Sequence, residues 1–352
     1  MIVILLHKSS MCAKIHKYNQ IILESVILMD YTFANRICGL KPSAIREIFK
    51  YAADPQVVSL SAGNPAPDAF PAKELAEISE RLMKENPVLA LQYGLTEGYL
   101  PLRESLKKYM KEDYNIGRDF DEIIVTSGAQ QVMDLLTKSL VNEGDEIVCE
   151  APSFIGSLNT FRSYGAKLLG VPMEADGMNM EELENTLKSH SKIRFIYTIP
   201  TFQNPSGITM SLEKRRKLYE LAKKYNVLIL EDNPYGELRY KGETLPTIKS
   251  MDEDGIVVYA GSFSKVISPG MRVGWFVAPQ EVAQKMVVCG LMSGTTEYFF
   301  TKDGNGIFYL CSFLQIRDQH CGCTSGHLGI SGYQKIRDTV YSEPYSCGEY
   351  HE

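Results

Sequence analysis

The sequence predicts an α/β protein with a mostly parallel sheet flanked by helices. Short apolar runs of the kind found in buried strands alternate along the chain with helical patterns of apolar residues. Such alternation favours a parallel sheet, because parallel strands need a crossover connection that is usually a helix. Several of the apolar runs also end in polar residues. Ligands of such sheets bind beyond the carboxyl ends of the strands, so these residues are the first candidates for a site.

The N-terminal part contains a leader and then an arm. Residues 1–28 show no clear pattern, because Glu24 and Ser25 interrupt two apolar runs, and we expect the fold to tolerate their removal. Residues 29–70 are predicted to form an arm with a helix after Pro42 and a strand over 57–60. Gly63 then lies in a loop rich in glycine and proline, a composition typical of loops that line binding sites.

Residues 71–290 are expected to form one large domain. Helices are predicted over 71–85, 102–109, 132–140, 180–187 and 212–225 and from about Phe154, and strands over 122–126, 146–149, 167–171, 194–199, 227–230 and 256–260. Gly128 stands between a strand and the following helix. The unpaired N–H groups and dipole of a helix start make that step a candidate anion site.

Composition excludes several classes of function. The 352 residues are 44% hydrophobic and 23% charged, which is typical of a globular protein. The formal net charge of −6 argues against a general binder of nucleic acid or of membrane surfaces. No apolar run reaches the length of a membrane span, and no secretory signal precedes the arm, so we predict a cytoplasmic protein. The eight cysteines include no CxxC pair, so we expect no metal site.

The stretch from Gly261 to Arg272 carries the most specific chemistry. It follows the predicted strand 256–260 and combines serine hydroxyls with Lys265 and Arg272. A guanidinium fork and hydroxyls suit a phosphate, and a lysine beside that phosphate can form a Schiff base with a phosphate-bearing aldehyde. The cofactor with this chemistry is pyridoxal 5′-phosphate (PLP). A serine-rich surface turn would share this composition, so the other motifs must decide.

Asp232 comes directly after the predicted strand 227–230. A carboxylate that faces the pyridine nitrogen of PLP keeps this nitrogen protonated, and the ring then withdraws electrons from a substrate carbanion. A helix cap or a turn residue is the alternative. The position of Asp232 at the end of a strand, in the element before the lysine strand, favours the functional interpretation.

Five motifs occur in order and together resemble a known family. They are Tyr93-Gly94 with Gly98, Leu102 and Arg103; Thr126-Ser127-Gly128-Ala129-Gln130-Gln131; Asn204-Pro205-Ser206-Gly207; Asp232-Asn233-Pro234-Tyr235; and Ser262-Phe263-Ser264-Lys265 with Arg272. From Met29 to about Val288 the chain resembles the fold-type I PLP enzymes of class I and II aminotransferases. Within them it is most similar to the aminoadipate/kynurenine type, whose catalytic domain also occurs in MocR-type regulators.

The resemblance implies a role for each motif residue. Lys265 would hold the cofactor covalently and move the substrate α-proton, while Asp232 would pair with the ring nitrogen. Tyr235 and Asn204 would bind the ring oxygen, and Phe154 would stack on the ring. The phosphate ligands would be Ala129, Gln130, Ser262, Ser264 and Arg272, with Tyr93 reaching the phosphate of the partner subunit in a homodimer, and the substrate ligands would be Gly63 and Asn204. Ala129 replaces a serine often found there, so one hydroxyl donor is lost while the backbone N–H remains.

The C-terminal part departs from the family pattern. The family continues as a small α/β domain that supplies an arginine for the substrate carboxylate. In this chain the family pattern fades after about Val288, residues 291–352 form a divergent tail, and residues 303–352 show no convincing helix or strand period. We therefore expect this domain to be missing or degraded.

The predicted activity is PLP-dependent transfer of an amino group between an amino acid and a 2-oxo acid, and we expect the abnormal C-terminal part to impair it. The alternatives are an inactive truncated or frame-disrupted homologue, a PLP-binding regulator-type domain, and another PLP reaction such as C–S lysis.

Overall fold

The computed structural model describes residues 32–38 and 65–293. The chain divides into two units, Met1–Gly39 and Leu40–Glu352. In the first unit the described residues include the short helix α2 (Asn35–Cys38). The second unit contains the sheet and the candidate site. The predicted leader, the elements expected at 42–60, the loop of Gly63 and the tail beyond residue 293 lie outside the described residues.

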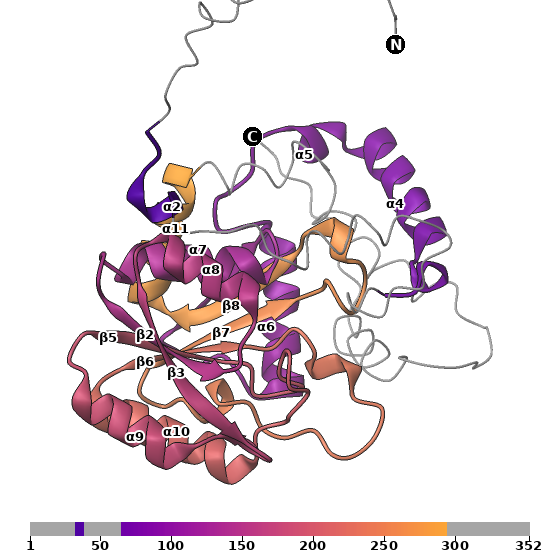
Figure 1. Ribbon diagram of the computed structural model, residues 1–352. Helices are drawn as coiled ribbons and strands as arrows, with labels where there is room; N and C mark the ends of the chain where they lie inside the picture. Colours follow the sequence, from indigo (N-terminus) through magenta and orange to yellow (C-terminus); the bar gives the residue numbers. More distant parts are fainter. Residues whose placement is uncertain (1–31, 39–64, 294–352) are drawn as a thin grey trace, which may run out of the picture. The chain divides into compact units, whose positions relative to one another are not determined.

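The described part of the second unit contains one eight-stranded sheet, in the order β1-β8-β7-β6-β5-β2-β3-β4 (Figure 1). The strands are β1 (Asp121–Thr126), β2 (Glu146–Ala151), β3 (Lys167–Glu174), β4 (Gly177–Met178), β5 (Ile193–Thr198), β6 (Leu228–Asp232), β7 (Val257–Ser262) and β8 (Gly274–Pro279). The pairs from β7 through β6, β5 and β2 to β3 are parallel, so the predicted fold class is confirmed. Strand β8 is antiparallel to both neighbours, β1 and β7, and the sequence analysis missed it.

Helices cover both faces of the sheet. The helices in the described part of this unit are α4 (Ala72–Glu85), α5 (Pro87–Leu91), α6 (Leu100–Tyr114), α7 (Ala129–Leu140), α8 (Ile155–Ser163), α9 (Met180–Ser189), α10 (Leu212–Tyr225) and α11 (Gln280–Ser293). Helices α7, α8 and α11 share an apolar core with one face, whereas α9 and α10 pack on the other face, where α6 builds a third cluster (Figure 1). Helix α7 begins at Ala129, three residues before the predicted start, so Ala129 and Gln130 belong to its first turn.

The central strands are buried on both faces, which explains their continuous apolar sequences. In β5, Phe195 and Tyr197 pack under α7 and α8, while Ile196 faces the core of α9 and α10. All three side chains are fully buried. Each such side chain contributes roughly 1.5–3 kcal/mol through its removal from water. This two-sided burial fixes the register of the strands and therefore the positions at which they end.

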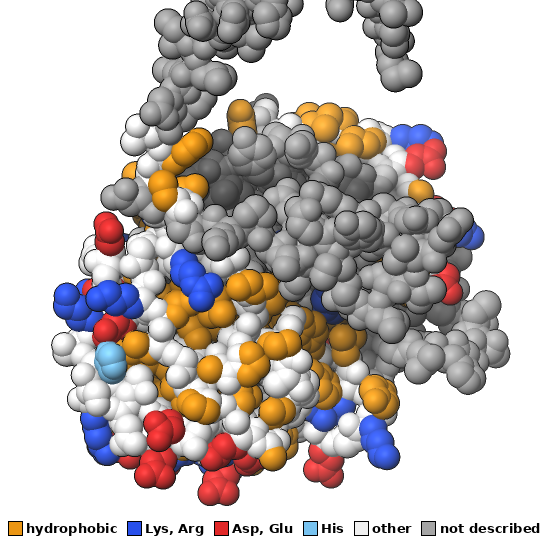
Figure 2. Space-filling model, viewed as in Figure 1, with side chains coloured by type: hydrophobic (Ala, Val, Ile, Leu, Met, Phe, Trp, Pro, Cys, Tyr) orange, Lys and Arg blue, Asp and Glu red, His pale blue; other side chains and the backbone are white. Residues whose placement is uncertain are grey.

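Many charged side chains lie on the outer surface, although Glu150, Arg215 and Asp232 are buried. Figure 2 shows acidic side chains at the lower edge of the view, where Figure 1 places α9 and α10. Within the described ranges, none of the helices has both the length and the apolar character needed to cross a bilayer.

Candidate active site

Three neighbouring strands bring the predicted residues to one edge of the sheet. Strand β6 ends at Asp232, which pairs in register with Ala260 of β7. Strand β7 continues into the turn that holds Lys265. Strand β5, on the other side of β6, leads into the loop of Asn204. Because these strands are parallel, their carboxyl ends meet at the same edge, as the sequence predicted.

The carboxylate of Asp232 is only half satisfied by hydrogen bonds. Its side chain is 4% exposed, and its Oδ2 accepts a hydrogen bond of 2.9 Å from the Tyr197 hydroxyl. Its Oδ1 is buried and has no hydrogen-bond partner among the described residues. Burial raises the pKa of Asp232 to about 7, although the hydrogen bond from Tyr197 acts in the opposite direction. A buried acceptor of this kind indicates that a ligand donor is expected at Oδ1.

Tyr197 and Ser157 orient this carboxylate, and the sequence analysis did not identify either of them. Ser157, in α8, donates a hydrogen bond of 2.9 Å to the Tyr197 hydroxyl, which in turn donates to Asp232. The apolar run of strand 194–199 indicates only a core position for Tyr197. A buried tyrosine usually needs a partner for its hydroxyl, and this was the signal available in the sequence.

Tyr235 and Asn204 are in direct contact. The amide Nδ2 of Asn204 donates to the Tyr235 hydroxyl at 3.1 Å. Burial raises the pKa of Tyr235, so its hydroxyl stays protonated and can donate to an acceptor on a ligand. The two residues come from loops 31 positions apart in the sequence. Their contact therefore creates a polar pair beside the end of β6.

The amine of Lys265 is half-buried in the turn after β7. Burial lowers the pKa of Lys265, and the positive charge of Arg272 lowers it further. No hydrogen bond or ion pair holds the amine to another residue in the described part of the chain. A larger fraction of the amine is therefore neutral near pH 7 than for an exposed lysine, and a neutral amine is the reactive form.

Arg272 packs tightly against the start of α7. We call the site formed by Arg272, Ser127, Gly128 and Gly274 the cradle. Arg272 adopts left-handed backbone geometry, with φ of 54°, and its Nη2 donates to the Ser127 carbonyl at 3.2 Å. A Cβ added to Gly128 would lie 2.3 Å from Nη2 of Arg272. A Cβ on Gly274, at the start of β8, would lie 2.7 Å from the Gly128 carbonyl carbon. Only glycine fits at either position. The two glycines therefore let the Arg272 guanidinium lie close to the N-terminus of α7, and together these two positive groups can bind an anion.

The other predicted phosphate ligands surround this cradle. Ser262 donates from its hydroxyl to the Ser264 hydroxyl at 3.0 Å and accepts from the Ser264 N–H at 3.1 Å. The amide of Gln130 donates to Thr160 at 2.7 Å, so this side chain joins α7 to α8. Ala129 and Gln130 lie in the first turn of α7, so their backbone N–H groups can donate hydrogen bonds to an anion.

Three predicted site residues remain, namely Phe154, Tyr93 and Gly63. Phe154 ends the loop before α8, and a Cβ on Gly156 would lie 2.6 Å from its ring, so the ring packs closely over Gly156. Tyr93 is 76% exposed in the loop before α6. Gly63 lies outside the described residues.

A second buried carboxylate supports the loop of Asn204. Glu150, at the end of β2, accepts hydrogen bonds from the Thr198 hydroxyl at 2.6 Å and from the Gln203 amide at 3.1 Å. Gln203 also donates to the Pro152 carbonyl at 2.8 Å. Burial raises the pKa of Glu150 to about 7, and the charge of Asp232 acts in the same direction. No motif in the sequence marks Glu150, which holds the loop of Asn204 through its hydrogen bond from Gln203.

The donor set of this edge fits pyridoxal phosphate. The unpaired Oδ1 of Asp232 can accept from the N–H of a protonated pyridine ring. Tyr235 and Asn204 can bind the ring oxygen, Lys265 offers an amine for the aldehyde, and the cradle of Arg272 offers positive charge for the phosphate.

Comparison with known proteins agrees with this site. The family described as "Aminotransferase class I and II" matches residues 55–290. The aromatic-amino-acid aminotransferase 1 of Thermococcus litoralis is 42% identical over 266 residues, which cover 74% of this chain and 64% of that protein. The 2-aminoadipate transaminase of Thermus thermophilus is 38% identical over 251 residues, with 70% and 62% covered. The chain thus spans less than two thirds of the length of these two curated relatives.

A solved structure shows the same fold. The kynurenine aminotransferase of Pyrococcus horikoshii, solved in complex with PMP, KYN and KYA, superposes with a TM-score of 0.75 at 31% identity. The match covers 94% of this chain and 75% of that one. The resemblance predicted from the motifs is confirmed, and the chain belongs to the class I and II aminotransferase family.

Proposed function

We propose that this protein is a PLP-dependent aminotransferase that moves an amino group between an amino acid and a 2-oxo acid. The observation that carries the proposal is the buried carboxylate of Asp232, which offers an unpaired oxygen at the strand end next to the lysine-bearing strand. An isolated buried carboxylate is costly, so a fold keeps one where a ligand supplies the missing donor.

Asp232 would hold the ring nitrogen of the cofactor. When bound, PLP supplies an electron-poor ring that stabilises negative charge at the substrate α-carbon. Oδ1 of Asp232 would accept from the ring N–H, while Tyr197 keeps Oδ2 in place. Because Tyr197 is itself held by Ser157, the carboxylate cannot rotate without breaking a hydrogen bond.

Lys265 would move the substrate proton. The depressed pKa of its amine makes the neutral form, which can accept a proton at Nζ, more abundant near pH 7. After it accepts the proton, the same amine can donate it to another carbon. The turn after β7 is well placed for this role, because it lies at the edge of the sheet that also carries Asp232.

Arg272 and the start of α7 would bind the phosphate. The guanidinium supplies a positive charge, and the first N–H groups of the helix supply donors without a cost in side-chain entropy. Ser262 and Ser264 add hydroxyl groups. Phe154, packed over Gly156, is the candidate to stack on the ring.

A homodimer is part of this proposal. Tyr93 is 76% exposed, and its apolar neighbours Leu91 and Leu95 are 68% and 64% exposed. Apolar side chains gathered on a surface favour contact with another protein, and a second copy of this chain would bring Tyr93 to its phosphate site. We further propose that the protein acts in the cytoplasm.

The test uses the purified full-length chain with PLP, a 2-oxo acid and a panel of amino acids. Aromatic amino acids and 2-aminoadipate come first in the panel, because two relatives carry those names. We expect a new 2-oxo acid to form with the wild type and none to form with Lys265→Ala. Binding of PLP without turnover of any amino acid would contradict the proposed activity and favour a regulator-type or inactive domain.

A further inference from the structure

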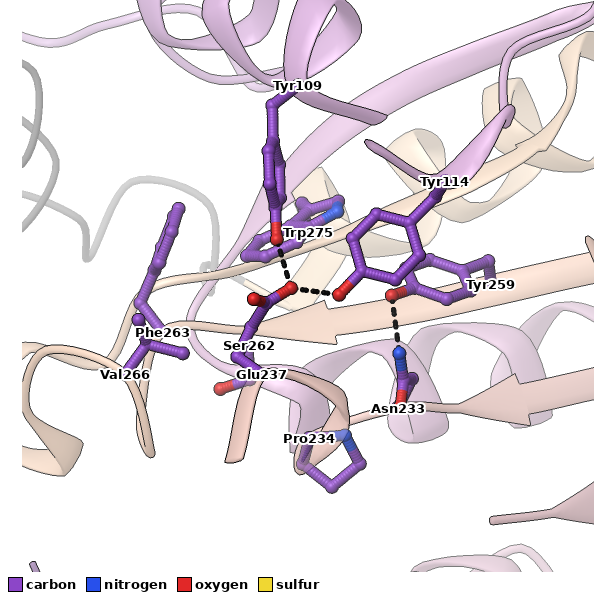
Figure 3. A pocket seen from close by; sticks show the side chains of 10 residues that line it. All are labelled: Tyr109, Tyr114, Asn233, Pro234, Glu237, Tyr259, Ser262, Phe263, Val266 and Trp275. Carbon is purple, nitrogen blue, oxygen red and sulfur yellow. Dashed lines mark hydrogen bonds between the residues drawn. The ribbon is translucent and has the colours of Figure 1, made fainter. Parts of the chain in front are cut away.

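A cluster of aromatic residues lies on the opposite face of the sheet from α7, beneath the end of β6. We call it the tyrosine cluster, and its members are Tyr109 and Tyr114 of α6, Tyr259 of β7, Trp275 of β8 and Glu237 (Figure 3). Tyr109, Tyr259 and Trp275 are 2%, 2% and 4% exposed. The cluster lines a small cavity together with Ser262, Phe263 and Val266 of the lysine loop. The cluster therefore borders the segment after Asp232 and the loop of Lys265, which both carry candidate site residues.

Glu237 is the polar centre of this cluster. It lies in the short 3-10 helix η2 (Gly236–Leu238), two residues after Tyr235. One oxygen of its carboxylate, Oε1, accepts hydrogen bonds from the hydroxyls of both Tyr109 and Tyr114 (Figure 3). Burial raises the pKa of both tyrosines, so both hydroxyls keep their protons and donate. The two tyrosines therefore attach η2 to α6.

A second contact fixes the beginning of the same segment. The amide of Asn233 donates from Nδ2 to the Tyr259 hydroxyl at 3.0 Å, and its backbone N–H donates to the Ala260 carbonyl at 3.0 Å. A Cβ on Gly236 would lie 2.6 Å from Nδ2 of Asn233, so the turn is folded tightly onto this amide. Residues 232–237 are thus attached to the sheet at one end and to α6 at the other.

Tyr235 lies between these two attachment points. A carboxylate held by two tyrosines is a costly way to fill space, because apolar residues of similar volume often stabilise a core as well or better. The arrangement instead fixes the position of η2, because each hydrogen bond to Glu237 limits where this short helix can lie. The position of η2 matters most for the adjacent Tyr235, whose hydroxyl accepts a hydrogen bond from Asn204 at the candidate cofactor site.

We propose that Glu237 is a positioning residue that acts through Tyr235: its carboxylate, held by Tyr109 and Tyr114, sets the place of the Tyr235 hydroxyl at the cofactor ring. This inference rests on the proposed PLP site, and it concerns cofactor affinity rather than turnover.

The experiment is a double-mutant cycle read by the dissociation constant for PLP. It uses the full-length wild type, Glu237→Ala, Tyr235→Phe and the double variant, with the melting temperature of each cofactor-free protein measured in parallel. Trp275 is the only tryptophan in the chain, so its fluorescence reports directly on the tyrosine cluster. Glu243→Gln is the matched control, because Glu243 is exposed and follows the same segment.

We expect Glu237→Ala and Tyr235→Phe each to raise the dissociation constant for PLP about tenfold. The double variant should be no more than about twofold weaker than Tyr235→Phe alone, because both changes remove the same effect. Glu243→Gln should bind like the wild type. If Glu237→Ala does not fold, Tyr114→Phe, which removes one of the two donors, takes its place in the cycle.

Two results would overturn the proposal. One is independent action, in which the two single changes multiply in the double variant. The other is a lower melting temperature with a PLP dissociation constant within twofold of the wild type, which would show a purely structural role. A wild-type chain that binds no PLP at all would overturn the proposed function, and this inference with it.

Discussion

The hydroxyl of Tyr197 donates a hydrogen bond of 2.9 Å to Oδ2 of Asp232 and leaves Oδ1 of that carboxylate buried without a partner among the described residues. One oxygen is thus fixed by the protein, and the other remains available to a ligand. This arrangement keeps the carboxylate oriented before the cofactor arrives, so little ordering remains to be done on binding.

The stability of the cofactor-free protein should depend on pH through Asp232. Its folded pKa is about 7, above the ordinary value of 3.8, so its contribution to stability is fully present below about pH 4 and is lost as pH rises through about 7. A shift of this size corresponds to about 4 kcal/mol as an order of magnitude. Chemical denaturation of wild type and Asp232→Asn, at about pH 5 and about pH 8, measures the effect.

Asp232→Asn should lose less stability than the wild type between these two pH values. It should retain some loss, because Glu150 also has a pKa raised to about 7 and contributes with the same sign. Equal losses in the two proteins would contradict the raised pKa of Asp232. Addition of PLP should stabilise the wild type more than Asp232→Asn, since only a carboxylate can pair with the protonated ring nitrogen.

Gly128→Ala should weaken the binding of PLP. Its Cβ would lie 2.3 Å from Nη2 of Arg272, so the guanidinium must leave the start of α7. The matched control is Gly144→Ala, because Gly144 also has positive φ, 85° against 74° for Gly128, but has no atom within 4 Å of the added Cβ. Both variants should lose about 1 kcal/mol of stability from backbone strain.

Only Gly128→Ala should raise the dissociation constant for PLP, by about tenfold or more, as measured by equilibrium dialysis. Comparable affinities of the two variants would show that the cradle beneath Arg272 does not hold the phosphate.

Lys265 should be the residue that reduction labels. Treatment of the PLP-loaded protein with borohydride, followed by peptide mapping, should place the pyridoxyl group on Lys265. The reason is its half-buried amine of lowered pKa at the edge that also carries Asp232. Lys265→Ala should retain no label under the same conditions, and a label on any other lysine of the wild type would refute the assignment.

Arg215 should be essential for stability rather than for chemistry. It is fully buried in α10 and donates to the carbonyls of Met210, Pro246 and Pro200 and to the Thr201 hydroxyl. Arg215→Ala leaves these acceptors unsatisfied, and we expect a loss of at least about 3 kcal/mol in the free energy of unfolding.

The neighbouring residue Arg216 is exposed and provides the control. Arg216→Ala should change the free energy of unfolding by less than about 0.5 kcal/mol, measured by urea denaturation. A similar loss for both variants would show that the buried hydrogen bonds of Arg215 contribute little.

Much of the fold could be predicted because it depends on local sequence patterns. Helix α10 begins and ends at the predicted residues, and the strands that end at Asp232 and Ser262 were located to within two residues. Strand β8 was missed although Trp275–Ala278 is an apolar run like those of the predicted strands. Its antiparallel place between β1 and β7 is a tertiary property that no local pattern indicates. Helix α7 was predicted to start too late, since Gly128 was its only marked boundary.

The sequence by itself determined which chemical groups stand at the strand ends, because a strand's periodicity and its terminal residues are local properties. Asp232, Lys265, Asn204 and Arg272 could therefore be named from the sequence alone. Only the tertiary structure decided how these groups are held. Tyr197 reaches Asp232 across 35 residues of sequence, and Glu237 meets Tyr109 across 128. Such pairs form only after the sheet has brought distant elements together, so the sequence contains their members but not their contact.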